Sequence, residues 1–467
     1  MKVINRKEIM YRSEKMNEVR HATLNPNGPG AVRIHLIPPA MGVENAKDID
    51  IEKYPAMVIL NGQYYVPVNR SFSVLLNEFL TLLDKYAGKT VKDVDIEKIV
   101  KTTIKNVHKI YPFTSSKRMK EDLSNMIDLF CDIAYGKEIE TDEIPVMSIG
   151  NYAPFMRAPY RMDLMVSAMT KDGKWHCNQK CLHCYAAGQP DAEAEELSTK
   201  QWEEIIKKCY KACISQVTFT GGEPTMRKDL PEIVGYAKKL VTRLNTNGIN
   251  MSKNLCKQLF DASLDCVQVT FYSFDPRKHN YLVGAEMYEK TLQGIKNILE
   301  VGLNISINTP LCSINKDYVK TLEFLHNLGI QYVTCSGLII TGNATKEKSI
   351  SSQLSKEELY SILEEAVAYC EKNDMELAFT SPGWIPEEDL KRLKLTVPSC
   401  GACLSNMAVA PDGSVVPCQS WLSAEPLGSI LCDEWDTIWN SEKCKKIRKE
   451  SAKMEHKCPL NNAHKNI

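Results

Sequence analysis

Three cysteines crowded into one short segment constrain this chain more than any other feature. The segment runs Trp175-His-Cys-Asn-Gln-Lys-Cys-Leu-His-Cys-Tyr-Ala-Ala-Gly188, with Cys177, Cys181 and Cys184 in a C-x3-C-x2-C spacing. Thiolates at such intervals are typical ligands of zinc or iron. A four-iron cluster normally takes four cysteines, so a compact set of three predicts a cubane with one iron open to a ligand from outside the protein.

The segments on either side of these cysteines strengthen the prediction. A strand-like run, 160–169, comes just before them, and an apolar run, 217–220, ends in Gly221-Gly222-Glu223. Two glycines let the backbone approach a ligand closely, and a carboxylate accepts a hydrogen bond from an ammonium group. With these segments the chain resembles the radical S-adenosylmethionine (SAM) enzymes, whose signature is this cysteine spacing, with an aromatic residue where His183 stands here, and a GGE motif.

The resemblance implies an activity and its cofactors. In that family the amino and carboxylate groups of SAM chelate the open iron of a [4Fe-4S] cluster. An electron then cleaves SAM to methionine and a 5'-deoxyadenosyl radical, which abstracts a hydrogen from the substrate. A low-potential electron donor such as ferredoxin or flavodoxin is therefore expected. A zinc loop is the alternative for the cysteine spacing taken alone.

Composition excludes several other classes of protein. The 467 residues carry 58 Lys and Arg against 58 Asp and Glu, and this balance favours neither a nucleic-acid partner nor an anionic membrane surface. The sequence has no apolar run of about 18 residues and no signal peptide at its N-terminus, which predicts a cytoplasmic protein. Seventeen cysteines then indicate metal ligation in a reducing compartment rather than disulfides.

Alternating strand and helix patterns predict an α/β fold, the partial (βα)6 TIM-like barrel of the radical SAM enzymes, over residues 155–345. Six strands are expected near 161–169, 216–220, 240–245, 265–272, 303–309 and 331–337. Active sites of such barrels gather at the carboxyl ends of the strands. By this rule and by the resemblance, SAM contacts are expected from Gly221, Gly222, Glu223, Asn247, Thr270, Ser273, Ser306 and Asn308, with Tyr185 beside the cluster.

A small α+β domain is expected before the barrel, at residues 1–145. Residues 1 to about 55 show no clear pattern, but Asn61-Gly62 between two β-prone runs, 56–60 and 63–68, predicts a two-residue hairpin. Helices are expected over 71–84, 96–110 and 117–135. This order is similar to the winged-helix-like peptide-recognition domain of radical SAM enzymes that modify ribosomally made peptides, where a leader peptide adds to the hairpin. A structural appendage is the alternative.

The end of the chain predicts a cysteine-rich hairpin domain at residues 396–467, joined to the barrel by bridging helices at 346–395. Cys400-Gly-Ala-Cys403 is followed by a Pro-Asp-Gly turn and Cys418. The pattern resembles the auxiliary iron-sulfur domain of radical SAM enzymes known as SPASM or, in its shortened form, twitch. We expect one auxiliary cluster on Cys400, Cys403, Cys418 and Cys458, with Cys432 and Cys444 as rival fourth ligands and structural zinc as the alternative.

The sequence therefore predicts a radical SAM enzyme. Its N-terminal and C-terminal domains favour modification of a ribosomally made peptide, by a thioether or carbon-carbon crosslink or an oxidation. Oxidation of a small molecule and maturation of a partner enzyme use the same barrel and stay open. So does a different class, an iron-sulfur electron-transfer or sensing protein without turnover.

Overall fold

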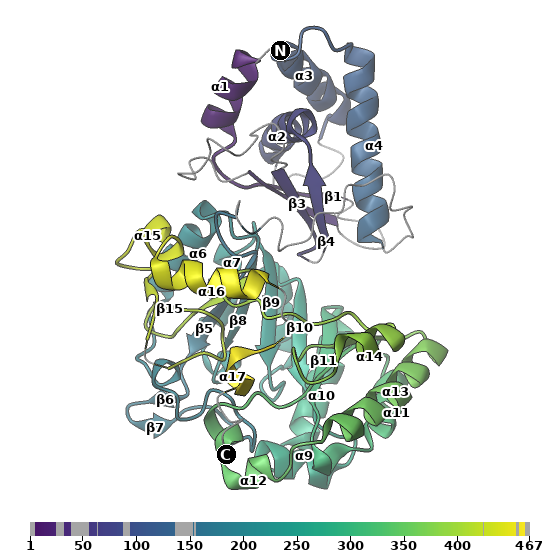
Figure 1. The fold of residues 1–467 in the computed structure, drawn as a ribbon, viewed down its shortest axis with the longest axis vertical. Helices are drawn as coiled ribbons and strands as arrows, with labels where there is room; N and C mark the ends of the chain where they lie inside the picture. Colours follow the sequence, from purple (N-terminus) through teal and green to yellow (C-terminus); the bar gives the residue numbers. More distant parts are fainter. Residues whose placement is uncertain are drawn as a thin grey trace. The chain divides into compact units, whose positions relative to one another are not determined.

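The computed structural model describes residues 5–24, 32–38, 56–62, 64–86, 94–135, 153, 156–423, 425–453 and 457–462 (Figure 1). The chain divides into two compact units. The first comprises Met1–Tyr160, Cys209–Ser215 and Lys239–Val241, and the second comprises Arg161–Lys208, Gln216–Lys238 and Thr242–Ile467. The domain boundary expected near residue 145 lies outside the described residues.

The first unit contains a four-stranded antiparallel sheet in the order β1-β2-β3-β4. Its elements are α1 (Arg6–Lys15), β1 (Arg20–Leu24), β2 (Val32–Ile37), β3 (Ala56–Leu60), β4 (Tyr64–Val68), α2 (Arg70–Asp84), α3 (Ile96–His108) and α4 (Ser116–Ala134). The expected hairpin is confirmed as β3 and β4, and Asn61 and Gly62 adopt the positive φ angles, 52° and 68°, that such turns require. The loop is longer than the two residues expected, because Leu60 pairs with Tyr64.

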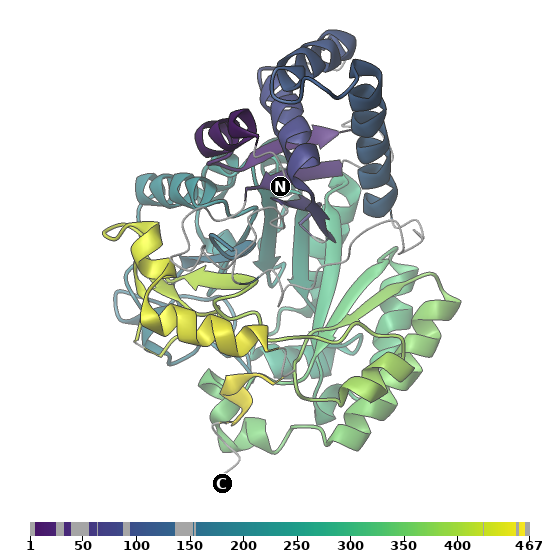
Figure 2. The same ribbon diagram turned by 45° about the horizontal axis from the view of Figure 1, so that its top comes forward.

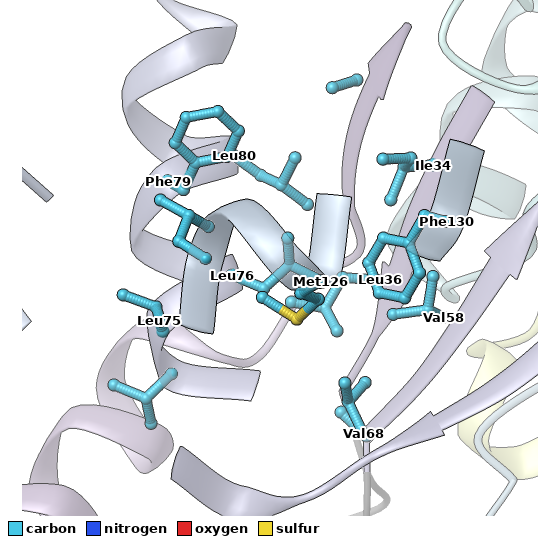
Figure 3. Close-up of a cluster of buried hydrophobic side chains, with 14 of the residues drawn as sticks. Ile34, Leu36, Val58, Val68, Leu75, Leu76, Phe79, Leu80, Met126 and Phe130 are labelled. Carbon is cyan, nitrogen blue, oxygen red and sulfur yellow. The ribbon is translucent and has the colours of Figure 1, made fainter. Parts of the chain in front are cut away.

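Apolar side chains of the sheet pack against α2 and α4 to form the core of this unit. Figure 3 shows Ile34, Leu36 and Val58 of the sheet in one cluster with Leu76 of α2 and Phe130 of α4. The three expected helices begin where a side chain accepts a backbone N–H, at Asn69, Asp95 and Ser115. The strands β1 and β2, which the sequence left unassigned, are paired with each other and with β3.

A sheet of ten strands runs through the second unit in the order β13-β12-β11-β10-β9-β8-β5-β14-β15-β16. The six expected barrel strands are β5 (Arg161–Ser167), β8 (Gln216–Gly221), β9 (Val241–Thr246), β10 (Cys266–Thr270), β11 (Asn304–Pro310) and β12 (Tyr332–Ser336). The pairs β5–β8, β9–β10, β10–β11 and β11–β12 are all parallel, which confirms the α/β barrel type of fold. The short hairpin β6 (Thr170–Lys171) and β7 (Lys174–Trp175) leads into the cysteine segment.

Helices surround these strands, as Figure 2 shows for the teal to green part of the chain. They are α6 (Thr199–Lys211), α7 (Leu230–Tyr236), α8 (Lys253–Asp261), α9 (Pro276–Val283), α10 (Tyr288–Val301), α11 (Tyr318–Asn327), α12 (Glu347–Ile350), α13 (Lys356–Lys372) and α14 (Glu387–Arg392). The sequence predicts only helices in 346–395, but this region also supplies β13 (Glu376–Phe379), which lies parallel to β12 and extends the sheet.

The C-terminal hairpin belongs to the same sheet. Its elements are β14 (Asn406–Val409), β15 (Ser414–Val416), β16 (Gly428–Ser429), α15 (Trp435–Trp439), α16 (Glu442–Ala452) and α17 (Pro459–Asn462). Strand β14 pairs antiparallel with β15 across the predicted Pro-Asp-Gly turn and parallel with β5 on its other side. This second pairing joins the cysteine-rich hairpin to the first barrel strand. Within the described ranges, every helix is too short or too polar to span a lipid bilayer.

Candidate active site

A cavity of about 670 Å3 lies inside the barrel unit. Three parts of the chain line it: the inward side chains of the parallel strands, the cysteine segment, and residues that flank the C-terminal cysteines. The cysteine segment contributes Cys177, Gln179, Cys181, His183, Cys184 and Tyr185, and the C-terminal domain contributes Pro398, Ser399, Ser405, Asn406 and Gln419. One cavity therefore reaches both cysteine-rich regions, and its volume is in the range of small-molecule sites.

The cysteine segment is held in place by backbone hydrogen bonds that it donates to the C-terminal end of α9. Lys180 N–H donates to the carbonyl of Val283 (3.0 Å), and Leu182 N–H donates to that of Leu282 (2.8 Å). Gly284 packs so closely here that an added Cβ would lie 2.4 Å from the carbonyl oxygen of Lys180. The position of the middle cysteine, Cys181, is thus fixed from outside the segment.

A second loop, residues 341–352, clamps the end of the cysteine segment. Asn343 donates from its backbone N–H to the carbonyl of Cys184 (2.8 Å) and from its side chain to that of Cys181 (3.1 Å). His183 Nε2 lies 2.7 Å from Ser352 Oγ, and burial lowers the pKa of His183 to about 4. The neutral ring therefore serves as a packed aromatic group at the position where the resemblance expects one.

The three thiols lie at the cavity wall in an environment that disfavours free thiolates. Burial raises the pKa of Cys177 to about 12, and it also raises the pKa values of Cys181 and Cys184. Neighbouring thiols add to the effect, because a negative charge on one raises the pKa of the next. Such a group releases its protons when a cation replaces them, as iron does. Among the described residues, no three Cys, His, Asp or Glu side chains already stand at metal-binding geometry.

The two glycines of the GGE motif are required by the protein's own backbone. Gly221 has a φ angle of 133°, and an added Cβ there would lie 2.1 Å from the carbonyl oxygen of Ser167. At Gly222 the corresponding contact is with Ala168 O at 2.7 Å. The sequence argument attributed the glycines to close approach of a ligand, and both line the cavity. The structure shows that they also let β8 end directly against β5.

Glu223 is buried and accepts four hydrogen bonds. Thr225 N–H, Thr225 Oγ1 and Thr246 Oγ1 donate to Oε1, and Asn247 N–H donates to Oε2 at 2.8 Å. Burial raises the pKa of Glu223, although each of these donors lowers it. With one bond on Oε2, that oxygen has a lone pair left for a donor in the cavity, whose wall includes Glu223.

Most of the other expected SAM contacts lie on the same wall. Asn247, Thr270, Asn308 and Tyr185 line the cavity. The side chain of Asn247 donates to Asn178 Oδ1 at 2.6 Å and so connects the end of β9 to the cysteine segment. The cavity brings these side chains together, and they stay candidates for SAM binding.

Two of the expected contacts lie elsewhere. Ser273 is fully buried, is absent from the cavity wall, and accepts a hydrogen bond from Asp275 N–H at 3.1 Å. Ser306 also lies off the wall, and its hydroxyl oxygen is buried without a hydrogen-bond partner among the described residues. The cavity is lined instead by Gln268 and Thr270 of β10 and by Asn308 and Pro310 of β11.

The sequence argument missed charged residues in the barrel. Asp163 on β5 is buried, lines the cavity and forms an ion pair with Arg161 at 3.0 Å. A second guanidinium, Arg243 of β9, also lines the cavity and forms no ion pair with a carboxylate of the described residues. The sequence could have indicated both residues, because charged side chains are uncommon inside predicted buried strands and those that occur often belong to a functional site.

The C-terminal cysteines form a separate group behind the cavity. Cys400, Cys418 and Cys458 are close enough for a charge on Cys400 or Cys458 to raise the pKa of Cys418, and Cys444 likewise lies close enough to raise the pKa of Cys403. Cys432 is exposed. Four sulfurs suffice for a cubane, so the donor set fits an auxiliary iron-sulfur cluster, and the structure brings Cys458 and Cys444, but not Cys432, to the group.

Comparisons with known proteins agree with this geometry. A model of the radical SAM superfamily matches residues 176–325, and a model of the SPASM iron-sulfur cluster-binding domain matches residues 400–460. Crystal structures of SuiB from Streptococcus suis, bound to its precursor peptide SuiA or to S-adenosylmethionine, have TM-scores of 0.59 and 0.60. Identity to them is 14% and 16%, over 88% of this chain and 94% of theirs.

Curated relatives match part of this chain. An Fe-coproporphyrin III synthase of Methanosarcina barkeri is 29% identical over 188 residues, 39% of this chain and 46% of that protein. A probable GTP 3',8-cyclase of Thermococcus kodakarensis is 34% identical over 134 residues, 28% of this chain and 43% of that protein. The chain thus spans about half the length of the curated relatives it matches.

Fold, cavity and matches together define a radical SAM enzyme, whose cofactors are a [4Fe-4S] cluster and SAM. More particularly, it carries a C-terminal SPASM domain, the part of such enzymes that binds auxiliary iron-sulfur clusters.

Proposed function

We propose that this protein reductively cleaves SAM and directs the resulting 5'-deoxyadenosyl radical to a hydrogen of a ribosomally made peptide, leading to a crosslink or an oxidation. The observation that carries the proposal is the single cavity that touches both the Cys177–Cys184 segment and residues flanking Cys400, Cys403 and Cys418. A substrate held there would lie between the two cluster sites.

In this proposal, Cys177, Cys181 and Cys184 hold the SAM-binding cluster, which supplies the electron for SAM cleavage. Glu223 Oε2 accepts a hydrogen bond from the SAM ammonium group. Gly221, Gly222, Asn247, Thr270 and Asn308 shape the remainder of the SAM site, and Tyr185 packs beside the cluster. Ser273 and Ser306 act behind these residues, since neither lines the cavity. A low-potential donor such as ferredoxin or flavodoxin reduces this cluster before each SAM cleavage.

The auxiliary cluster is assigned to Cys400, Cys403, Cys418 and Cys458. Three of these thiols, on Cys400, Cys418 and Cys458, are electrostatically coupled, and Cys403 is coupled to Cys418. Such a cluster would take the electron that the substrate radical releases when a bond forms or an oxidised product is made. The cavity-lining residue next to Cys418 is Gln419, whose buried Oε1 has no hydrogen-bond partner among the described residues. A peptide N–H of the substrate would satisfy it.

The peptide proposal is supported by the first unit and by a structural neighbour that was crystallised with a peptide. Residues 1–145 would be a peptide-recognition domain, because β4 is an outer strand of its sheet and can accept an added strand. Pro67 lies on β4 and has no N–H, so an added strand would find its donors on the other residues. SuiB, which shares the fold, was crystallised with its precursor peptide.

A small anionic molecule is the second candidate substrate. Arg161 and Arg243 line the cavity, and only Arg161 is paired with a carboxylate of the described residues. A cavity with an unpaired guanidinium favours carboxylates and phosphates. Two curated relatives are named for coproporphyrin and GTP chemistry.

Release of 5'-deoxyadenosine by the reconstituted, reduced protein tests the common core. Release that depends on SAM and on Cys177, Cys181 and Cys184 is expected, and an iron-sulfur protein without it would be an electron-transfer or sensing protein. Stimulation of that release is then compared for a pool of synthetic peptides and for GTP. Stimulation by GTP, and none by peptides, would reject the peptide proposal.

Hydrogen exchange of the full-length protein tests the recognition domain. A peptide that stimulates release should slow exchange of amides in β3 and β4. Protection within the barrel alone would show that the first unit does not bind the peptide by strand addition.

A further inference from the structure

One face of α16 is turned toward the cysteines of the C-terminal domain. Cys444, Arg448 and Ser451 are spaced four and three residues apart, which places them on the same side of the helix. Ser451 Oγ donates to the carbonyl of Ala402 (2.8 Å) and lies 4.0 Å from Cys400 Sγ. This face therefore meets the Cys400–Cys403 turn along its length.

Cys403 occupies a backbone conformation that a side chain seldom adopts. Its φ angle is 52°, in the left-handed region, and its N–H donates to the carbonyl of Pro417 at 3.2 Å. The strained turn that this conformation makes is held by that bond beside the face of α16.

Cys444 is fully buried on this face of α16, and its thiol is close enough to that of Cys403 for a charge on one to shift the pKa of the other. With Cys400, Cys403, Cys418 and Cys458 as the ligands of the proposed cluster, Cys444 is left as a buried neighbour of Cys403 whose S–H can donate to a ligand sulfur.

Arg448 stands behind Cys444. Its Nη1 donates to Cys444 Sγ at 3.5 Å, and both terminal nitrogens donate to the carbonyl of Trp439 at 3.2 Å. The guanidinium carbon lies 3.8 Å from the centre of the Trp439 ring, a cation–π contact that fixes the side chain. No carboxylate of the described residues forms an ion pair with this half-buried cation, whereas the neighbouring Lys449 is exposed.

We propose that Cys444 and Arg448 form an outer hydrogen-bonding layer around the auxiliary cluster and make that cluster easier to reduce. The inference rests on the auxiliary cluster of the proposed function. When such a cluster takes up one electron its charge becomes more negative by one, and a hydrogen bond to a ligand sulfur and a nearby cation both stabilise that reduced state. A cluster that is easier to reduce suits the role proposed for the auxiliary cluster, which is to accept an electron from the substrate radical.

A redox titration of the auxiliary cluster tests this role. The background is the Cys177/Cys181/Cys184→Ala protein, in which the auxiliary site is the expected iron site. Cys444→Ala, Arg448→Met and the matched control Lys449→Met are compared for iron, sulfide and zinc per chain, and for the midpoint potential followed by electron paramagnetic resonance. All are expected to keep about four irons.

The midpoint potential should fall in Cys444→Ala and in Arg448→Met and stay unchanged in Lys449→Met. A tenfold loss in the one-electron equilibrium constant corresponds to 59 mV. Unchanged potentials in both variants would overturn the inference. Loss of the four irons in Cys444→Ala alone would also overturn it, because Cys444 would then be a ligand. Zinc in place of iron in the Cys177/Cys181/Cys184→Ala protein without further substitution would instead refute the auxiliary cluster itself.

Discussion

Replacing Gly342 by alanine tests whether the 341–352 loop sets the position of the cysteine segment. Gly342 has a φ angle of 57°, and an added Cβ would lie 2.4 Å from the carbonyl oxygen of Tyr185 and 2.6 Å from that of Cys184. Gly302 is the matched control, since it is also left-handed, with φ 82°, and an added Cβ there would meet nothing within 4 Å. Both variants place alanine in a left-handed backbone conformation, but only Gly342→Ala also brings a Cβ into contact with neighbouring carbonyls.

The magnitudes follow from these contacts. Alanine in the left-handed region costs about 1–2 kcal/mol of folding free energy, which both variants should lose. At Gly342 the carbonyls of Cys184 and Tyr185 must also retreat by roughly 1 Å to restore ordinary contact. Overpacking of this kind costs about 1–3 kcal/mol. We therefore expect a loss of about 1–2 kcal/mol for Gly302→Ala and about 2–5 kcal/mol for Gly342→Ala.

Two assays measure the consequence. Urea unfolding of the apoprotein gives the stability difference, and iron per chain after anaerobic reconstitution reports whether the displaced Cys184 still binds. Gly342→Ala should lose most of the iron of the SAM-binding cluster, and Gly302→Ala should keep it. Equal stability and equal iron content in the two variants would refute the claim that this loop positions the cysteines.

Three further predictions follow from the site and its surroundings. The Cys177/Cys181/Cys184→Ala protein should lose about four of about eight irons and all 5'-deoxyadenosine release, as iron analysis and chromatography would show; retained release would remove these cysteines from the mechanism. Glu223→Gln should weaken SAM binding about tenfold or more in calorimetry, because a charge-assisted hydrogen bond contributes about 1.5–3 kcal/mol, and unchanged affinity would exclude the contact. Burial lowers the pKa of His279 to about 4, whereas a histidine in the unfolded chain has a pKa of about 6.5. Between these values the unfolded chain binds the proton and the folded protein does not. The free energy of unfolding should therefore be constant above about pH 6.5 and fall by on the order of 3 kcal/mol as pH drops toward 4. Unfolding of His279→Phe across this range should lack that part of the pH dependence, and an unchanged profile would contradict the assignment.

Local patterns were enough to predict the barrel. Each strand was indicated by apolar residues between turn signals. Local pairs such as Ser198 with Gln201 and Ser355 with Glu358, three residues apart, also mark helix starts, and in the structure each serine N–H donates to the side chain three residues on. The cysteine spacing and the GGE motif identified one end of the cavity because a ligand set and a strand end are contiguous in sequence.

Contacts between distant parts of the chain were beyond such patterns. Nothing near β14 indicates that it pairs with β5, some 240 residues earlier. The role of Gly221 depends on Ser167, which only the fold brings to it. The sequence left Cys444 as a rival fourth ligand of the auxiliary cluster, and only the fold places it on α16 beside Cys403. Each of these features follows from tertiary packing, which a periodicity cannot encode.

The parallel pairing of β14 with β5 has a consequence for any attempt to divide this protein. Removing residues 396–467 would leave β5 with an unpaired row of backbone groups beside β8. Met162, Leu164 and Val166 of β5 are fully buried in the intact chain, so the truncated sheet would present an apolar margin open to pairing with other molecules. We expect the truncated protein to aggregate, so its loss of activity would say little about electron transfer. Point substitutions at the cysteines are the informative way to separate the two cluster sites.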